Sequence, residues 1–195
     1  MPRLNSELRV RHSNFINVDI GSFYACSDGS VLRTLLGSCV SACLYDPLAG
    51  VAGMNHILLS EVADMKRFDA SARYGIHAME ILINEMVKLG AARSRIKAKA
   101  FGGSNVLRSL ADTMSPGEKN IKFLLEYLEM ERIPVMAKDL GGDKTRVIFF
   151  HTDTFEVFVR KTSTSQAKQA ISKEKSRKTQ VVEEKDQAGD IELFD

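Results

Sequence analysis

The sequence predicts an α+β fold, in which layered sheets of mixed or antiparallel strands pack against two main helices. Alternation of apolar and polar residues, typical of strands, occurs near both ends of the ordered region, and each end contains an expected hairpin. Two segments with helical spacing lie between these ends, without the strict strand–helix alternation of parallel α/β folds. With 195 residues, 44% of them hydrophobic, the chain can hold one domain with a substantial core, or at most two small ones.

Composition and charge exclude several classes of protein. The formal net charge is +2 and the basic residues are spread along the chain, so we expect neither a nucleic-acid partner nor binding to an anionic membrane. No apolar run approaches the ~20 residues that span a bilayer, and the N-terminus lacks the apolar core of a signal peptide. We therefore expect a cytoplasmic protein that does not insert into a membrane.

The cysteines indicate the redox compartment and argue against a metal site. There are three of them, Cys26, Cys39 and Cys43, which is an odd number in a chain without an export signal. This pattern predicts a reduced protein without structural disulfides. Since the Cys39–Cys43 spacing comes with no nearby pair of histidines, it matches no common zinc site. We expect no metal and no cofactor.

The first part of the chain is expected to be mainly strand. Polarity, alternation and turn residues predict each element in order. From the N-terminus, these are a mobile segment at 1–14, a strand at 15–26, a turn at 28–30, a segment at 31–36 that leads into a hairpin, the hairpin strands at 40–45 and 51–59, and a charged loop at 60–69.

Two helices follow, separated by a strand at 96–101. The first is expected over 70–89, with Asp69 or Ser71 as N-cap and Gly90 after its end. The second begins with the capping box Ser115-Pro116-Gly117-Glu118, which places proline at the first helical position. The expected buried positions are Ala72, Ile76, Met79, Ile83 and Met86 in the first helix, and Ile121, Leu124, Leu125 and Leu128 in the second.

The last part of the chain contains a second hairpin and then changes in composition. A short strand at 135–137 and a loop at 138–144 precede the hairpin strands at 145–150 and 155–161. From residue 162 onward the sequence is polar and charged, with too few apolar residues to offset the entropy of ordering. We therefore expect one folded domain at 15–161 and a disordered charged tail at 162–195.

Cys39 and His56 are the leading candidates for catalysis. If residues 46 and 50 face each other across the first hairpin turn, the register places Cys39 beside His56 or Ile57, although a slip of one residue would turn the imidazole to the other face. A thiol next to an imidazole is the arrangement of a cysteine nucleophile with its base. Gly37 and Ser38 leave room for a substrate carbonyl, and backbone N–H groups in this turn can bind an oxyanion.

Other interpretations of these residues remain open on the sequence alone. Buried cysteines are often small core residues, and a histidine in an apolar strand is often a hydrogen-bonded core residue. Thr34, Ser38, Ser41 and Asn55 are each candidates to orient the imidazole. His77 on a helix and His151 in a hairpin turn are expected to face solvent or pack locally. The Gly-Gly pairs at 102–103 and 141–142 lack the features of a phosphate-binding loop, so turn geometry explains them.

The segment LGSCVSACLYDP, followed by GMNHILL, resembles the CheD-type chemoreceptor glutamine deamidases of bacterial chemotaxis. The resemblance extends in order over residues 15–161. It continues through RYGIHAMEILINEMVKLGA, KAKAFGGSNVL, GEKNIKFLLEYLEMERIPVMAKDLGG and TRVIFF.

This resemblance implies a protein-glutamine glutaminase, an amidohydrolase that converts glutamine side chains of methyl-accepting chemoreceptor cytoplasmic domains to glutamate and releases ammonia. It implies a fold similar to that of toxin deamidases of the cytotoxic necrotizing factor type. It also implies a cysteine nucleophile at Cys39, a histidine base at His56 and a threonine, Thr34, as third member. The alternative is a non-catalytic binding module that docks on receptors and on a CheC-type phosphatase, which it regulates.

Overall fold

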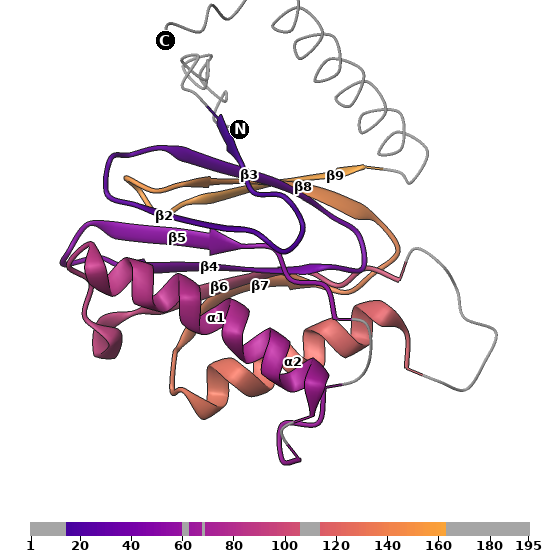
Figure 1. Ribbon diagram of the computed structural model, residues 1–195. Coiled ribbons are helices and arrows are strands. Elements are labelled where there is room, and N and C mark those ends of the chain that lie inside the picture. The colour runs from indigo at the N-terminus through magenta and orange to yellow at the C-terminus, as the bar shows by residue number, and fades with distance from the viewer. Residues whose placement is uncertain (1–14, 60–62, 68, 106–113, 163–195) are drawn as a thin grey trace, which may run out of the picture. The chain divides into compact units, whose positions relative to one another are not determined.

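The computed structural model describes residues 15–59, 63–67, 69–105 and 114–162 (Figure 1). The expected mobile N-terminus at 1–14 and the tail beyond residue 162 lie outside the described residues. The chain divides into two units, Met1–Lys161 and Thr162–Asp195, and nearly all of the second lies outside the described residues.

The first unit is built of three layers (Figure 1). One sheet has the strand order β1 (Phe15–Asn17), β3 (Val31–Leu36), β8 (Thr145–His151) and β9 (Val157–Thr162). The second has the order β2 (Phe23–Cys26), β5 (Val51–Asn55), β4 (Val40–Asp46), β6 (Lys97–Gly102) and β7 (Val135–Leu140). Helices α1 (Ala70–Lys88) and α2 (Pro116–Met130) cover the outer face of the second sheet, and a short 3-10 helix η1 (Arg93–Arg95) follows α1.

Both sheets contain a parallel pair beside antiparallel ones, so both are mixed. The parallel pairs are β1–β3 and β6–β7, whereas β3–β8, β2–β5, β4–β5 and β4–β6 are antiparallel. The layered α+β architecture predicted from the sequence is therefore confirmed. No helix in the described ranges is long and apolar enough to cross a membrane.

Strand β4 is buried on both faces, although its alternation predicted one buried face. Val40, Ala42 and Leu44 pack in the apolar layer formed with the helices. Cys43 and Tyr45 pack in the layer between the two sheets. The sequence misled because the first sheet covers the face that looked free for solvent. Cys39, just before the strand, belongs to the layer between the sheets.

Three other expectations need correction. The single strand expected at 15–26 is two strands in different sheets, because a turn at Asp19–Ser22, with Gly21 at φ +77°, redirects the chain. Strand β7 continues to Leu140, through part of the loop expected at 138–144. The alternation of apolar and lysine residues over 96–101 predicted a solvent-facing surface of this strand that includes Lys99. Instead Lys99 donates a hydrogen bond to the Phe155 carbonyl at 2.6 Å, because the first sheet covers this face too.

The helix boundaries follow the local signals. Asp69 caps α1 by accepting from the Ala72 N–H at 2.7 Å, and the capping box of α2 is present in full. The buried stripe of α1 is as expected except that Ile76 is only partly buried. On α2 the buried face is rotated: Phe123 and Tyr127 are buried, while Ile121 and Leu125 are partly exposed. This rotation also buries the polar side chain of Asn120.

Candidate active site

The turn Gly37-Ser38-Cys39 is held by its three carbonyl groups. The Gly37 carbonyl accepts from the backbone N–H of Ser104 at 2.8 Å and from its hydroxyl at 2.7 Å. The Ser38 carbonyl accepts from Asn120 Nδ2 at 2.9 Å, and the Cys39 carbonyl accepts from the Gly103 N–H at 2.7 Å. Strand β6 and helix α2 thus hold the backbone around Cys39 from the side of the helices.

Fixing these carbonyls also fixes the N–H groups of the same turn. In a planar trans peptide the C=O of one residue and the N–H of the next point in opposite directions. Because the Ser38 carbonyl points at Asn120, the Cys39 N–H points away from α2. It faces its own thiol, where it favours the ionised form. This N–H is therefore available for a negative charge that develops next to the sulfur.

The Gly102-Gly103 pair allows β6 to approach the turn. Gly102 has φ +109°, and a Cβ added there would lie 2.2 Å from the Cys39 carbonyl oxygen. A Cβ at Gly103 would lie 2.3 Å from Ile121 Cγ1. The buried Arg146 guanidinium donates to the carbonyls of Gly102, Asp139 and Gly141, and so ties this segment to the end of β7. Close backbone packing at the candidate nucleophile is thus the function of this glycine pair.

The hairpin register differs by one residue from the one assumed in the sequence analysis. Asp46 pairs with Val51, because the Asp46 carboxylate accepts from the N–H groups of Leu48 and Ala49 and places four residues in the turn. Further along, Val40 pairs with Ile57. Cys39 and His56 are therefore diagonal neighbours on the same face, at positions that lie about 7–8 Å apart in an antiparallel pair.

His56 is held from the other sheet. Its Nδ1 lies 2.8 Å from Thr34 Oγ1, which in turn donates to the Val18 carbonyl at 2.7 Å. Since the hydroxyl has one proton and gives it to Val18, Nδ1 must carry a proton and donate to Thr34. The Val18 oxygen, 3.3 Å from Nδ1, favours the same tautomer. We infer that Nε2 carries the lone pair, so that it can act as a base.

Burial keeps the candidate nucleophile and base neutral. Cys39 is 7% exposed, and burial raises the pKa of its thiol from 9.0 to about 11, although its own N–H opposes this shift. His56 is 3% exposed, and burial lowers the pKa of its imidazole below 6.5, against the opposing effects of the Val18 carbonyl and Asp19. His56 Nε2 makes no hydrogen bond within the described part of the chain, to Cys39 or to any other residue. The site thus holds a neutral thiol and a neutral imidazole rather than an ion pair.

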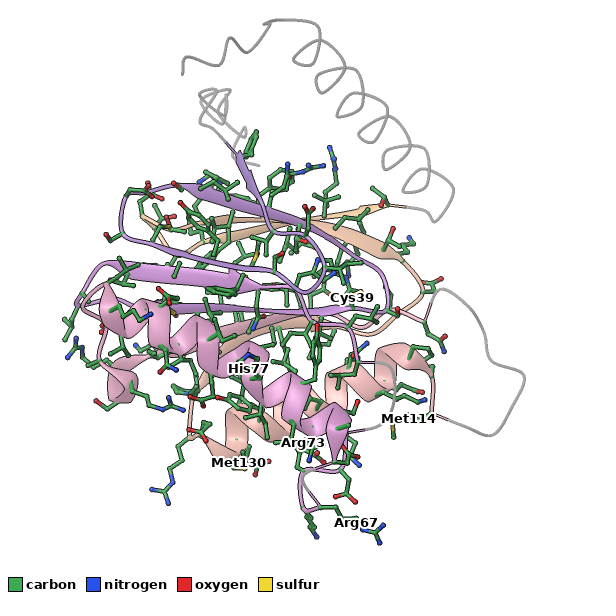
Figure 2. The ribbon with its side chains drawn as sticks, viewed as in Figure 1. Cys39, Arg67, Arg73, His77, Met114 and Met130 are labelled. Atoms are coloured by element: carbon green, nitrogen blue, oxygen red, sulfur yellow. The ribbon has the colours of Figure 1, made fainter. Side chains whose placement is uncertain are left out.

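The other cysteines and histidines of the described residues lie elsewhere. All three cysteines are free thiols. Cys43 is fully buried between the sheets, and Cys26 donates to Thr152 Oγ1 at 3.5 Å. His77 is exposed on α1, in the helical layer and away from the labelled Cys39 (Figure 2), and His151 packs edge-on against Phe158. These positions agree with the expectation that neither histidine belongs to the site.

Two further residues, Asn120 and Ser104, hold the site together and were not predicted from the sequence. Asn120 is fully buried on α2 and joins both candidate segments, because its Nδ2 donates to the Ser38 carbonyl and its Oδ1 accepts from the Leu59 N–H at 2.8 Å. One signal could have revealed it, since a polar residue among apolar positions with helical spacing must find buried partners. Ser104 carries no comparable signal, because small polar residues are ordinary in loops.

Comparison with known protein families gives a match over more than half of the chain. A family model described as CheD chemotactic sensory transduction matches residues 58–161. This match begins just after His56, so it does not itself include the candidate nucleophile and base.

Similar proteins align over most of the chain. The probable chemoreceptor glutamine deamidase CheD 2 of Chromobacterium violaceum is 43% identical over 92% of this chain and 89% of its own length, a share large enough to include Cys39 and His56. The probable chemoreceptor glutamine deamidase CheD 1 of Shewanella oneidensis is 43% identical over 89% of this chain and 84% of its own length. The protein of the same name from Geobacter sulfurreducens is 44% identical over 78% of this chain and 80% of its own length.

Solved structures give a weaker likeness. The hypothetical protein YfiH of Bacillus licheniformis has a TM-score of 0.36 and 16% identity, over 60% of this chain and 49% of that one. Neisseria meningitidis protein NMB0706 also has a TM-score of 0.36, with 9% identity over 62% of this chain and 52% of that one. These values carry no argument about fold or activity.

Proposed function

Because the chain belongs to the CheD family, whose relatives above are named chemoreceptor glutamine deamidases, we propose that it deamidates chemoreceptors in the cytoplasm. The substrates are glutamine side chains of methyl-accepting chemoreceptor cytoplasmic domains, and the products are glutamate and ammonia. The reaction adjusts receptor signalling in chemotaxis adaptation. The enzyme is then a protein-glutamine glutaminase with Cys39 as nucleophile.

One observation supports this mechanism above the others. The Thr34 hydroxyl holds the proton of His56 on Nδ1, and Nε2 is left buried and without a partner on the face of the sheet that carries Cys39. A buried imidazole nitrogen that binds nothing is a costly feature in a core. Its position beside a thiol gives it the role of a base that acts when substrate arrives.

The first half of the reaction forms a thioester. As Cys39 Sγ attacks the carboxamide carbon of glutamine, His56 Nε2 takes the thiol proton. The carbonyl oxygen becomes negatively charged, and the Cys39 N–H stabilises it. The imidazolium then gives its proton to the amide nitrogen, the C–N bond breaks, and ammonia leaves. The neutral resting state of both groups suits this order, because proton transfer and attack occur together.

The second half consumes water. His56 Nε2 takes a proton from a water molecule, whose oxygen attacks the thioester carbon. The C–S bond breaks, glutamate is released, and the imidazolium returns its proton to the Cys39 thiolate. Every proton in both halves is carried by Cys39, His56, water or the substrate.

The test is mass spectrometry of purified receptor cytoplasmic fragments after incubation with the protein. Conversion of each glutamine side chain adds ~1 Da, and the Cys39→Ala variant adds none, because the thiol is the nucleophile. The non-catalytic alternative predicts that neither protein changes the mass of any receptor, while both still bind receptor or a CheC-type phosphatase. That result with the wild-type protein would contradict the enzyme assignment.

A further inference from the structure

Two buried polar atoms without hydrogen-bond partners belong to residues at facing positions of the active-site hairpin. Among the described residues, only three buried side-chain atoms lack a partner: Ser41 Oγ, His56 Nε2 and Arg146 Nε. Ser41 is fully buried on β4, and His56 is 3% exposed. Unpaired polar atoms are rare in protein interiors, so two that lie together call for a shared explanation.

The strand register places Ser41 opposite His56. Val40 pairs with Ile57 on one side of this position and Cys43 pairs with Met54 on the other, so Ser41 and His56 fall on facing positions between them. Val40 and Ile57 exchange both backbone hydrogen bonds, at 3.0 and 2.8 Å, so the next position is a pair without such bonds. The Cβ atoms of such a pair lie about 4.5–5.5 Å apart.

The pairing of β4 with β5 is interrupted at this point. The Ala42 N–H donates to the side-chain oxygen of Asn55 at 2.9 Å rather than to a backbone carbonyl. The backbone of His56 bonds instead to the β2 side, through Ser22 and Gly21. The Asn55 side chain therefore replaces a backbone acceptor next to Ser41 and His56, whose side chains project into the layer between the sheets, where Cys39 also lies.

Ser41 is not a second orienting group for the imidazole. Thr34 already occupies Nδ1, whereas Ser41 lies on the strand that carries Cys39. Its hydroxyl lies close enough to Cys43 to lower the pKa of that thiol, a shift outweighed by burial, but it makes no hydrogen bond to it. The Ser41 hydroxyl is thus free to bind a small polar molecule beside His56 Nε2.

We propose that Ser41 and His56 together hold the water molecule that hydrolyses the thioester. In the first half of the reaction, Nε2 receives its proton from the Cys39 thiol. After acylation the sulfur has no proton, and Nε2 needs a new donor. A water molecule can donate to Nε2 and also bond to Ser41 Oγ, which can both donate and accept.

This water lies beside the carbon that it attacks, because Ser41 is two residues from Cys39 on the same face of one strand. Its oxygen forms the new C–O bond, the C–S bond breaks, and its proton passes through His56 to the departing thiolate. This inference rests on the proposed function and adds a residue that is specific to its second half.

The test compares the two half-reactions in wild type and Ser41→Ala, with receptor fragments as substrate. Removing an unpaired hydroxyl leaves the fold intact, so the thermal midpoint is unchanged or higher. We expect a first turnover of ammonia release at the wild-type rate, followed by a steady-state rate at least ~10-fold lower, within the range for positioning a reacting group. A covalent enzyme–receptor adduct, seen on a denaturing gel and cleaved by hydroxylamine, should accumulate. The control is Ser94→Ala, at an exposed position in η1, which should form no adduct.

Three outcomes would overturn the role of Ser41 while wild type remains active: an unchanged steady-state rate, an equal loss in both phases, or a slower steady state without adduct. Each would mean that the Ser41 hydroxyl has no role specific to hydrolysis of the thioester. Wild-type protein that releases no ammonia from any receptor fragment would instead overturn the proposed function, and the role of Ser41 with it. Ammonia release by the wild-type protein therefore distinguishes failure of the Ser41 role from failure of the proposed function.

Discussion

Thr34 Oγ1 lies 2.8 Å from His56 Nδ1. Thr34 lies on β3 of the first sheet and His56 follows β5 of the second, so a hydroxyl group on one sheet sets the tautomer of an imidazole on the other. The same oxygen donates to the Val18 carbonyl, and this bond leaves only the acceptor side of the hydroxyl for the imidazole. The proposed base is thus oriented by packing between the two sheets, through a residue 22 positions away along the chain.

Replacing Thr34 by valine should lower the turnover number without unfolding the protein. Valine keeps the shape of the side chain but removes the oxygen that accepts from Nδ1, so only the Val18 carbonyl, 3.3 Å away, still favours the tautomer with the lone pair on Nε2. We expect kcat to fall by about 10–100-fold, part of the roughly 10²–10⁴-fold that a general base contributes. Thr34→Ser is the matched control, since it keeps the hydroxyl and should retain most of the activity. Equal ammonia release by Thr34→Val and wild type would contradict this role.

The pH dependence should show a neutral thiol and a neutral base. Burial lowers the pKa of His56 from its ordinary value, so the acidic fall in kcat/KM should come at a lower pH than for an exposed histidine. Burial raises the pKa of Cys39 to about 11, so kcat/KM should not decline on the alkaline side up to that value. A thiolate–imidazolium pair would instead lose activity once the imidazolium deprotonates. Initial rates of ammonia release across this range distinguish the two cases.

The sequence predicted the elements better than their arrangement. Alternation and capping residues placed the hairpin and both helices, since these signals are local, as in the Ser115 capping box. Burial of β4 on both faces could not be predicted, because the covering sheet comes from strands before and after it in the chain. The break at Gly21 was missed because alternation continued through a turn that moves the chain between sheets.

The same distinction applies to the candidate site. Cys39 and His56 could be proposed from one hairpin, but their common face depended on a register that Asp46 sets through its hydrogen bonds in the turn. On the residues alone, four candidates remained for orienting the imidazole, and only the family resemblance favoured Thr34. In the structure only Thr34 of these four bonds to the imidazole. This hydrogen bond joins the two sheets, so it cannot be predicted from the hairpin alone. Asn120 and Ser104 escaped for the same reason, because their partners lie 82 and 67 residues away.

Asn120→Ala should affect both stability and catalysis. The Asn120 side chain satisfies the Ser38 carbonyl and the Leu59 N–H, and its loss leaves two buried backbone groups without partners. At about 1–3 kcal/mol for each unsatisfied group, we expect a loss of roughly 2–6 kcal/mol in the free energy of unfolding. Because these bonds connect the segments that carry Cys39 and His56, kcat should also fall at temperatures where the variant remains folded.

Leu128→Ala is the control for this prediction. Leu128 is 1% exposed on the same helix, and its truncation costs about 2–5 kcal/mol without touching the Cys39 turn. Denaturant titration should show comparable losses for the two variants, while ammonia release by the folded protein should fall only for Asn120→Ala. Equal turnover numbers would mean that Asn120 supports the fold alone.

Gly102→Ala should disable the site more severely than an alanine at another glycine with positive φ. A Cβ at Gly102 would lie 2.2 Å from the Cys39 carbonyl oxygen and 3.0 Å from Val40 Cα, and φ there is +109°. The backbone must move, and the hydrogen bond from Gly103 to Cys39 moves with it. We expect a loss of at least ~3 kcal/mol in stability, from backbone strain and overpacking together.

At Gly50, φ is +65° and no atom lies within 4 Å of an added Cβ, so Gly50→Ala should cost only about 1–2 kcal/mol and leave kcat unchanged. Thermal melts and ammonia release of both variants test this difference, and a Gly102→Ala protein with normal turnover would show that β6 need not approach Cys39 so closely.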